Sequence, residues 1–232
     1  MKVVLLAHTP DPERLVAAAA RLCYAEALPE EVLAGMTPEE IRSFLARLVA
    51  MEHLSPFEHA SFTFAVSGVS RALTHELVRH RIASYSQRSQ RYVNEEGFSF
   101  VTPPSIAADP AAGRIFAETM ATLRQAYAEL LGLGIPREDA RFVLPNACTT
   151  QILVTMNARS LRNFFALRCC GRAQWEIREL AWRMLELVRE VAPGLFVGAG
   201  PPCEATGRCN QGKMSCGRLA RKKGESDRRC DG

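Results

Sequence analysis

The chain has 232 residues, of which 47% are hydrophobic and 23% are charged, and its formal net charge is +4. This length and balance are those of an ordinary globular protein with one domain, or with one domain and an extension. No apolar run approaches the roughly 20 residues of a membrane helix, and the apolar start at residues 3–6 is too short for a signal peptide, so we expect a cytoplasmic protein that binds no membrane.

The first third of the chain predicts a strand, two helices and a second strand. The apolar run 3–7 fits a buried strand, and Asp11-Pro12 is a helix start with Asp11 as N-cap. A stronger start follows, where Thr37 caps a helix and Glu40 completes a capping box. Residues 57–67 alternate apolar and polar side chains, which predicts a half-buried strand of the antiparallel type.

The remainder of the body mixes strands and helices without regular βαβ units. Ser70 can cap a helix that runs to about Arg81. Further strands are expected at 98–101 and 149–156, and further helices at 111–131, at 136–144, from Asn157 or Ser160, and at 173–191. We therefore predict an α+β fold in which a mainly antiparallel sheet is flanked by helices in a single domain.

The composition changes after Gly198. Residues 199–232 are rich in glycine, proline, cysteine and basic residues, and they show no apolar period. Such a segment cannot bury enough apolar surface to form a core of its own. We therefore expect one domain at 1–198 and a Cys/Gly/Arg-rich C-terminal extension at 199–232.

The most unusual stretch is 79–92, which holds four arginines, one histidine and three serines. Clustered guanidinium groups repel one another unless anions are nearby, and serine hydroxyls add donors for phosphate oxygens. The alternative is a solvated basic loop. That alternative does not explain Ile82, Tyr85 and Tyr92, nor the apolar helical pattern that leads into the stretch. The stretch therefore predicts a ligand that carries phosphate.

Three blocks of sequence, taken in order, resemble the flavin-dependent thymidylate synthases and cover roughly residues 1–195. The central block carries the arginine-histidine-arginine signature of that family. The matching residues are His53, Ser55-Pro56-Phe57-Glu58-His59 and Phe62-Thr63-Phe64 upstream; Arg79-His80-Arg81, Ser84, Ser89 and Arg91 in the centre; and Pro136-Arg137-Glu138-Asp139-Ala140-Arg141, Leu144-Pro145, Asn157-Ala158-Arg159-Ser160-Leu161, Asn163-Phe164, Leu167-Arg168 and Ala173-Gln174-Trp175-Glu176-Ile177 downstream.

The resemblance implies an enzyme that converts dUMP to dTMP by reductive methylation. Methylenetetrahydrofolate would supply the carbon, and FAD reduced by NADPH would supply the hydride. The resemblance also implies a homotetramer with active sites shared between subunits and without nucleic acid as a partner. Arginines and serines suit ligands that carry phosphate, pyrophosphate and carboxylate groups.

The same resemblance assigns the site residues. Arg168 is the expected catalytic residue, because a cation there would stabilise negative charge that develops on the uracil ring. The positions that match the dUMP site are Glu76, Arg79, Gln87, Ser89, Arg91, Arg141 and Arg168. The positions that match the FAD site are His53, Ser55, Arg79, His80, Arg81, Gln87, Asn157, Arg159 and Asn163. Three positions depart from the family: Glu76, where glutamine is common, Gln87, where a glutamate is often found, and Arg172, where many members have histidine.

Two alternatives from other functional classes remain open. A cysteine-nucleophile pyrimidine transferase would use Cys148, whose thiolate would need a cationic or helix-terminal setting. A non-catalytic nucleic-acid-binding module would use the basic stretch and the tail, and its binding would depend strongly on salt. A purified flavoprotein is yellow, whereas neither alternative is.

The eight cysteines suit reduced thiols or metal ligands better than a disulfide scaffold, because the chain is long. Glycines between Cys203, Cys209 and Cys216 would let the tail turn back toward Cys169-Cys170, where thiolates can hold zinc or an iron–sulfur cluster. These spacings exceed the usual two to four residues between zinc ligands, and adjacent cysteines rarely share an ion. We therefore assign no metal, and we favour reduced thiols on a flexible tail, with Cys230 unconnected.

Overall fold

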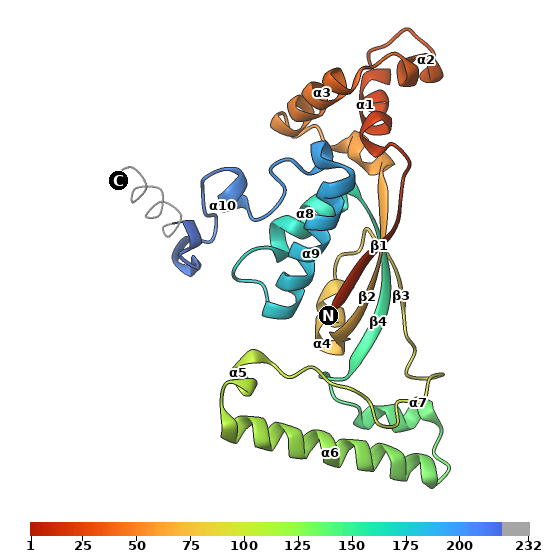
Figure 1. Cartoon of the computed structure of the whole chain (residues 1–232), viewed down its shortest axis with the longest axis vertical. Helices are drawn as coiled ribbons and strands as arrows, with labels where there is room; N and C mark the ends of the chain where they lie inside the picture. Colours follow the sequence, from red (N-terminus) through yellow and green to blue (C-terminus); the bar gives the residue numbers. More distant parts are fainter. Residues whose placement is uncertain (220–232) are drawn as a thin grey trace. The chain divides into compact units, whose positions relative to one another are not determined.

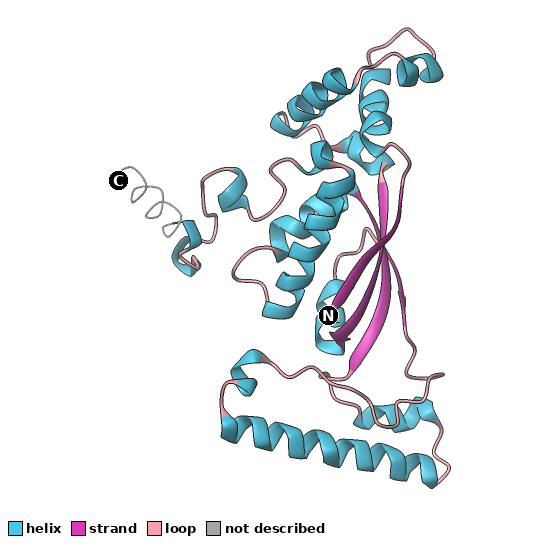
Figure 2. Cartoon of the chain, in the orientation of Figure 1, coloured by secondary structure: helices cyan, strands magenta, loops and turns pink. Residues whose placement is uncertain are grey.

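The computed structural model describes residues 1–219, apart from the side chains of Pro29, Leu33 and Ala34. Figure 1 labels its elements and Figure 2 separates helices from strands. Cys230, which we expected to be unconnected, lies outside the described residues. None of the described helices is long and apolar enough to cross a membrane.

Four strands form one antiparallel sheet in the order β1-β2-β4-β3. Their bounds are β1 (Lys2–His8), β2 (Ser61–Ser70), β3 (Ser84–Gln87) and β4 (Thr149–Asn157). In β4 every second side chain is buried, from Thr150 to Met156, as the alternating pattern requires of a strand with one covered face. The predicted α+β class with an antiparallel sheet is confirmed.

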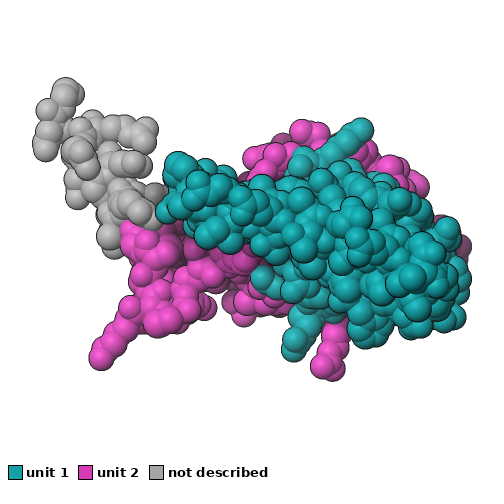
Figure 3. Space-filling view, turned by 90° about the horizontal axis from the view of Figure 1, so that it is seen from below, with its two compact units in different colours: residues 1–2, 65–79, 85–154 teal, residues 3–64, 80–84, 155–232 magenta. Residues whose placement is uncertain are grey.

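The chain divides into two compact units, which Figure 3 shows in different colours. Unit 1 comprises residues 1–2, 65–79 and 85–154, and unit 2 comprises the rest of the described chain. The division passes through all four strands of the sheet. We describe the two units separately, and the division of the chain at residue 198 stays a prediction.

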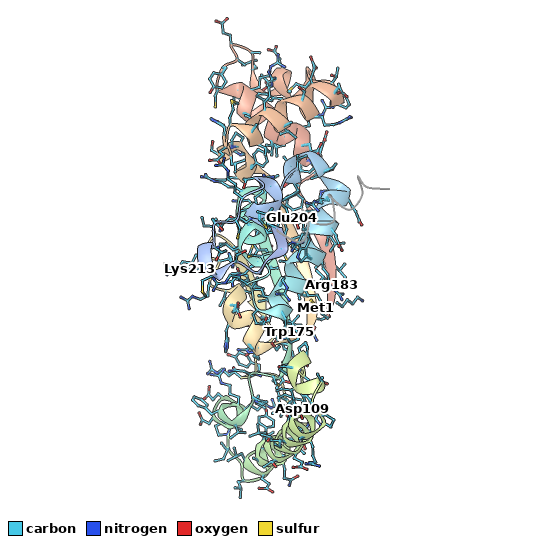
Figure 4. All side chains as sticks on the ribbon, turned by 90° about the vertical axis from the view of Figure 1, so that its left-hand side faces the viewer. Met1, Asp109, Trp175, Arg183, Glu204 and Lys213 are labelled. Carbon is cyan, nitrogen blue, oxygen red and sulfur yellow. The ribbon has the colours of Figure 1, made fainter. Side chains whose placement is uncertain are left out.

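Unit 1 contains α4 (Arg71–Leu77), α5 (Pro104–Ala107), α6 (Pro110–Gly132), α7 (Arg137–Ala140) and the 3-10 helix η2 (Arg141–Val143). The long helix α6 packs against α5, α7 and η2. Its cap is Asp109, labelled in Figure 4, which accepts hydrogen bonds from the amides of Ala111 and Ala112 at 2.8 and 3.0 Å. The buried centre of this part is formed by Phe98, Met120 and Cys148.

Two expectations for unit 1 are corrected. Residues 98–101 form no strand, because Phe100 makes only an isolated antiparallel bridge to Cys148. The helix capped by Ser70 ends at Leu77 rather than near Arg81, although the cap itself is confirmed by a 3.0 Å bond from the Leu73 amide to Ser70 Oγ. The basic stretch therefore begins outside the helix and enters the short strand β3, which the sequence pattern does not predict.

Unit 2 contains most of the remaining helices. Their bounds are α1 (Pro12–Leu22), α2 (Pro29–Ala34), α3 (Pro38–Ala50), η1 (Ser55–His59), α8 (Ala158–Arg168), α9 (Trp175–Val191), η3 (Pro193–Phe196), α10 (Pro202–Ala205) and η4 (Gly212–Met214). The capping box of α3 is confirmed, with Glu40 and Thr37 bonded in both directions. Asp11 stands at the N-cap of α1, but its side chain binds Arg14 at 2.9 Å instead of capping.

A run of aromatic rings forms the core of unit 2. Phe62 and Phe165 both contact Phe196 edge-on, with ring centroids 5.4 and 5.9 Å apart, and Phe164 contacts Phe165 at 5.7 Å. The ring of His80 stands edge-on to Phe164 at 5.0 Å. Edge-to-face contacts of this kind are preferred between buried rings. The core therefore supports His80, which belongs to the signature of the basic stretch.

The described part of the predicted extension is packed rather than free. Helix α10 and η4 both lie within it, and Arg189 on α9 donates to the carbonyl of Ala199 at 2.8 Å. The guanidinium of Arg218 lies over the Trp182 ring at 5.1 Å. The expectation of a flexible tail is therefore wrong for residues 199–219, which use the surface of α9 in place of a core of their own.

Candidate active site

The basic stretch is anchored by a half-buried tyrosine. The hydroxyl of Tyr85, on β3, donates to the carbonyl of Leu77 at 2.8 Å, which ties the strand to the end of α4. Burial raises the pKa of Tyr85 to about 12, so the hydroxyl stays protonated and can keep donating. In the same strand, the side-chain amide of Gln87 donates to Thr74 Oγ1 at 2.9 Å. These contacts exclude the alternative that residues 79–92 form a purely solvated loop.

Unit 1 holds an open cavity of about 350 Å³ with two arginines on its wall. It is lined by Arg71, Gln90, Arg141 and Phe142. Desolvation lowers the pKa of Arg71, and the charge of Arg141 lowers it further. The two positively charged guanidinium groups repel each other, and an anion bound between them would stabilise both. The cavity is therefore suited to a phosphate or to an ionised ring.

A buried carboxylate balances part of this charge. Glu95 is only 5% exposed, and its carboxylate lies 3.4 Å from the guanidinium of Arg88. Burial raises the pKa of Glu95, while Arg88 and Arg71 act in the opposite direction. A second arginine of the stretch, Arg91, forms an ion pair with Glu138 at 2.6 Å. Arg79 and Arg81 are exposed and pair with no carboxylate in the described part of the chain.

The thiol of Cys148 lies in the buried core of the same unit, and the carbonyl of Cys148 accepts the amide of Arg71 at 3.0 Å. Cys148 is 0% exposed, and burial raises its pKa to about 11, with Glu95 acting in the same direction and Arg71 opposing. A nucleophilic cysteine needs the thiolate form at neutral pH. A thiol with this pKa supplies almost no thiolate at neutral pH. Its buried position therefore does not favour the alternative in which Cys148 is the nucleophile.

In unit 2, Arg168 at the end of α8 contacts His80. The Nε atom of Arg168 donates to Nε2 of His80 at 3.0 Å. Burial is the larger cause and the charge of Arg168 the smaller, and together they lower the pKa of His80 to about 4. His80 is therefore neutral at pH 7 and acts as the acceptor in this contact. The contact fixes the direction of one edge of the Arg168 guanidinium.

Unit 2 also contains a cavity, with a volume of about 390 Å³. Its polar wall is formed by three residues of α8: Arg159, Arg162 and Asn163. Leu54, which directly precedes η1, also lines the cavity. Arg162 is committed to the carbonyls of Leu195 and Val197, at 2.8 and 2.9 Å, which holds η3 against α8. The remaining lining residues are Ala166, Gly198, Ala199, Gly200, Pro202, Ala205 and Thr206.

This cavity fits a flavin by its donor chemistry. Arg159 and Asn163 can donate to phosphate oxygens, although Arg159 also pairs with Glu58 at 2.6 Å. The apolar lining suits an aromatic ring system, and the volume falls in the range of small-ligand sites. No glycine-rich strand-to-helix turn takes part, so the residues would bind the cofactor through side chains rather than through a Rossmann turn.

The structure distributes the predicted site residues over both units. Unit 1 carries Glu76, Arg79, Gln87, Ser89, Arg91 and Arg141, and unit 2 carries His53, Ser55, His80, Arg81, Asn157, Arg159, Asn163 and Arg168. Arg159 and Asn163 share the cavity of unit 2, and Arg168 contacts His80. Asn157 caps α8, because its side-chain oxygen accepts a hydrogen bond of 2.8 Å from the Ser160 amide.

Sequence reasoning missed several residues of the two cavities. Arg71 and Gln90 line the cavity of unit 1, and Arg162 lines that of unit 2. Arg71 follows the helix cap Ser70 directly, and at that position it has the pattern of an ordinary surface residue. The one signal in the sequence that could have identified Gln90 is its position between Ser89 and Arg91.

Among residues 1–219, no group of three histidine, cysteine, aspartate or glutamate side chains is placed to hold a metal ion. The described cysteines are all free of disulfides.

The comparisons with known proteins agree with the resemblance of the three blocks. The sequence model described as "Thymidylate synthase complementing protein" matches residues 4–194. A flavin-dependent thymidylate synthase of Geobacter sulfurreducens is 54% identical over 222 residues, which cover 95% of each chain. Relatives of the same name from Clostridium tetani and Nitratidesulfovibrio vulgaris are 50% and 49% identical, over 96% and 94% of each chain. The chain therefore belongs to the family of flavin-dependent thymidylate synthases.

Proposed function

We propose that this protein converts dUMP to dTMP by reductive methylation, with methylenetetrahydrofolate as carbon donor and with FAD, reduced by NADPH, as hydride carrier. The observation that carries the proposal is the match to the Geobacter sulfurreducens flavin-dependent thymidylate synthase over 95% of both chains. Each unit also contains a cavity lined by arginine, as ligands that carry phosphate require.

The nucleotide is assigned to the arginine residues of unit 1. Arg71 and Arg141 would bind the phosphate, and Gln90 would donate to or accept from the pyrimidine. Ser89 and Arg91 lie in the adjoining turn, where Ser89 Oγ accepts the Arg91 amide at 3.2 Å. We retain Glu76, Arg79 and Gln87 as further contacts on the strength of the resemblance.

The flavin is assigned to the cavity of unit 2. Arg159 and Asn163 would hold its phosphates, with His53, Ser55, Arg79, His80, Arg81, Gln87 and Asn157 as further contacts implied by the resemblance. The reduced flavin supplies the hydride that the one-carbon group needs to become a methyl group. Arg168, oriented by neutral His80, would stabilise the negative charge that develops on the uracil ring. No protein nucleophile is needed, which agrees with the buried thiol of Cys148.

We further propose that the protein works in the cytoplasm as a homotetramer with shared active sites and without nucleic acid or membrane partners, as the resemblance implies. Light scattering on the purified protein tests the oligomer. A monomer at micromolar concentration would contradict it.

The decisive experiment is tritium release from ring-labelled dUMP by the yellow, flavin-loaded protein. Release should require NADPH and methylenetetrahydrofolate together, so omission of either is the control. Release without flavin that is lost in the Cys148→Ser variant would point to the cysteine-nucleophile alternative. No release, with tight salt-dependent binding of nucleic acid, would point to the binding module.

A further inference from the structure

A largely buried ion pair closes a loop that carries residues assigned to the nucleotide. The loop comprises residues 89–94, and its assigned residues are Ser89, Gln90 and Arg91. Arg88 and Glu95 flank it, and the Nε atom of Arg88 lies 3.4 Å from Oε1 of Glu95. Neither flanking residue is assigned to a ligand, and their pair joins the two ends of the loop.

The Glu95 end of the loop is fixed to the core of unit 1. The backbone amide of Glu95 donates to the hydroxyl of Tyr127 at 3.4 Å, and its carbonyl accepts the amide of Phe98 at 2.9 Å. Tyr127 on α6 and Phe98 are both buried, and so is the side chain of Glu95. The carboxylate is therefore held in one place beside Arg88.

The Arg88 end of the loop is fixed to the sheet. Arg88 directly follows β3, and its amide donates to the carbonyl of Gln151 on β4 at 2.9 Å. The two ends are thus held by different elements, one by a strand and the other by α6. The ion pair links these elements at the base of the loop.

The contacts made by the loop itself are more exposed than the pair at its base. The amides of Val93 and Arg91 donate to Ser89, to its carbonyl at 3.0 Å and to its Oγ atom at 3.2 Å. Arg91 also pairs with Glu138, but these side chains are 53% and 44% exposed, and exposed ion pairs contribute little. In the pair at the base the exposed fractions are 34% and 6%, so solvent screens it less. The conformation of the loop therefore depends mainly on closure by that pair.

We propose that Arg88 and Glu95 are positioning residues, whose ion pair holds the 89–94 loop in the conformation that binds a pyrimidine nucleoside monophosphate. A loop that is already closed loses less conformational entropy when its ligand binds, and this preorganisation strengthens binding. The residues that line the cavity of unit 1 include Gln90 but neither Arg88 nor Glu95, so the pair acts through the loop. The role in binding rests on the proposed function, whereas the closure of the loop does not.

The sign of the effect separates this role from a simple effect of charge. Desolvation lowers the pKa of Arg71, which lines the cavity, and the charge of Glu95 opposes this shift. Removal of a carboxylate near a site for phosphate makes the site more positive and should strengthen the binding of an anion. Loss of loop closure should weaken the same binding. Glu95→Gln, which keeps the shape of the side chain and removes its charge, therefore distinguishes the two effects.

Amide hydrogen exchange of the ligand-free full chain, followed by mass spectrometry, tests the closure of the loop. The amides of Arg91 and Val93 are bonded within the loop, so their exchange reports its opening. Peptides that cover residues 89–94 should exchange several times faster in Glu95→Gln than in the unmodified protein. Glu179→Gln is the matched control, because it removes a carboxylate from an exposed ion pair on α9 and should leave this exchange unchanged.

Steady-state kinetics with dUMP then test the role in binding. Glu95→Gln should raise the KM for dUMP by on the order of tenfold while kcat stays within about threefold, because the loop binds the nucleotide equally in the ground state and in the transition state. Arg88→Lys keeps the charge and should raise KM less than Arg88→Gln. The double variant Arg88→Gln/Glu95→Gln should be no worse than the more affected single variant, since both substitutions break the same pair. Glu179→Gln should change neither constant.

Three results would each overturn the proposal: unchanged exchange of the loop in Glu95→Gln, a KM that is unchanged or lower in that variant, or additive effects of the two substitutions. A parallel loss of kcat and of stability in urea would show a general structural role instead of a positioning role. If the unmodified protein neither binds nor converts dUMP, the proposed function fails, and hydrogen exchange alone decides whether the pair closes the loop.

Discussion

Arg168 donates from Nε to Nε2 of His80 at 3.0 Å, so the contact exists only while His80 is neutral. Burial and the charge of Arg168 together lower the pKa of His80 to about 4, which keeps the imidazole neutral at physiological pH. The edge-on contact of the His80 ring with Phe164 helps to hold the ring in place. The signature histidine is thus an acceptor that orients the guanidinium of Arg168, for which we propose the catalytic role.

Replacement of Arg168 by alanine should leave the fold intact and reduce turnover by about two to three orders of magnitude, because ring polarisation is lost. Tritium release from dUMP measures the loss, and circular dichroism checks the fold. Arg183→Ala on α9, which removes an exposed ion pair with Glu179, is the matched control and should stay active. Near-normal turnover in a folded Arg168→Ala variant would show that Arg168 is not the catalytic residue.

His80 should make stability depend on pH. In the unfolded chain the pKa of histidine is about 6.5, so between pH 4 and 6.5 the unfolded state binds more protons than the folded state. The free energy of unfolding should therefore fall as the pH is lowered through this window, by on the order of 2 kcal/mol after allowance for partial solvent screening.

Urea denaturation of the flavin-free protein at pH 5 and pH 7 measures that loss. The His80→Gln variant keeps an acceptor but cannot be protonated, so its stability should change less between the two pH values. His75→Gln, which replaces an exposed histidine on α4, should behave like the unmodified protein. An equal pH dependence in His80→Gln and the unmodified protein would show that His80 is not the group responsible.

Cys148→Ser should retain activity within about threefold. The thiol is buried, burial raises its pKa to about 11, and hydride transfer from a flavin needs no thiolate. A modest loss of stability is expected, since a hydroxyl replaces a small apolar group in the core of unit 1. Cys23→Ser, at an exposed position, is the control. Complete loss of activity in a folded variant would revive the covalent mechanism.

Arg71→Ala and Arg141→Ala should each raise the KM for dUMP by on the order of tenfold to a hundredfold, because a charge-assisted hydrogen bond to an anion is lost. The effect on kcat should be smaller, since binding of the phosphate does not change during the reaction. Arg114→Ala removes an exposed arginine of α6 and should change neither constant. An unchanged KM in both cavity variants would move the nucleotide away from this cavity.

The parts of the fold that sequence predicts well are those with local causes. The capping box of Thr37 and Glu40, the cap at Ser70 and the cap at Asn157 each join residues three apart, and all three are present. The alternation in β2 and β4 has the same local origin. Strand β3 was missed because it is only four residues long and gains its partner from β4, as in the bond from the Arg88 amide to the carbonyl of Gln151.

The site was predictable only where the family resemblance supplied it. Arg71 and Arg141 are 70 positions apart, and tertiary structure alone brings them onto one cavity. The partner of Arg91 is Glu138, which also lies far away in the sequence, so no pattern within 79–92 predicts which of its arginines are paired. The packed tail was missed for a similar reason, because its contacts are made with α9 rather than within itself.

Gly171 provides a test of how the tail is seated. A methyl group there would stand 2.8 Å from Cys216 Sγ and 3.2 Å from its Cβ atom, so Gly171→Ala should push the segment around Cys216 away from the end of α8. Trypsin should then cleave after Lys213 and Arg218 several times faster, and FAD should bind more weakly. Gly132→Ala, at the end of α6, meets nothing within 4 Å and is the matched control. Equal cleavage rates in the two variants would show that the contact at Gly171 does not hold the tail.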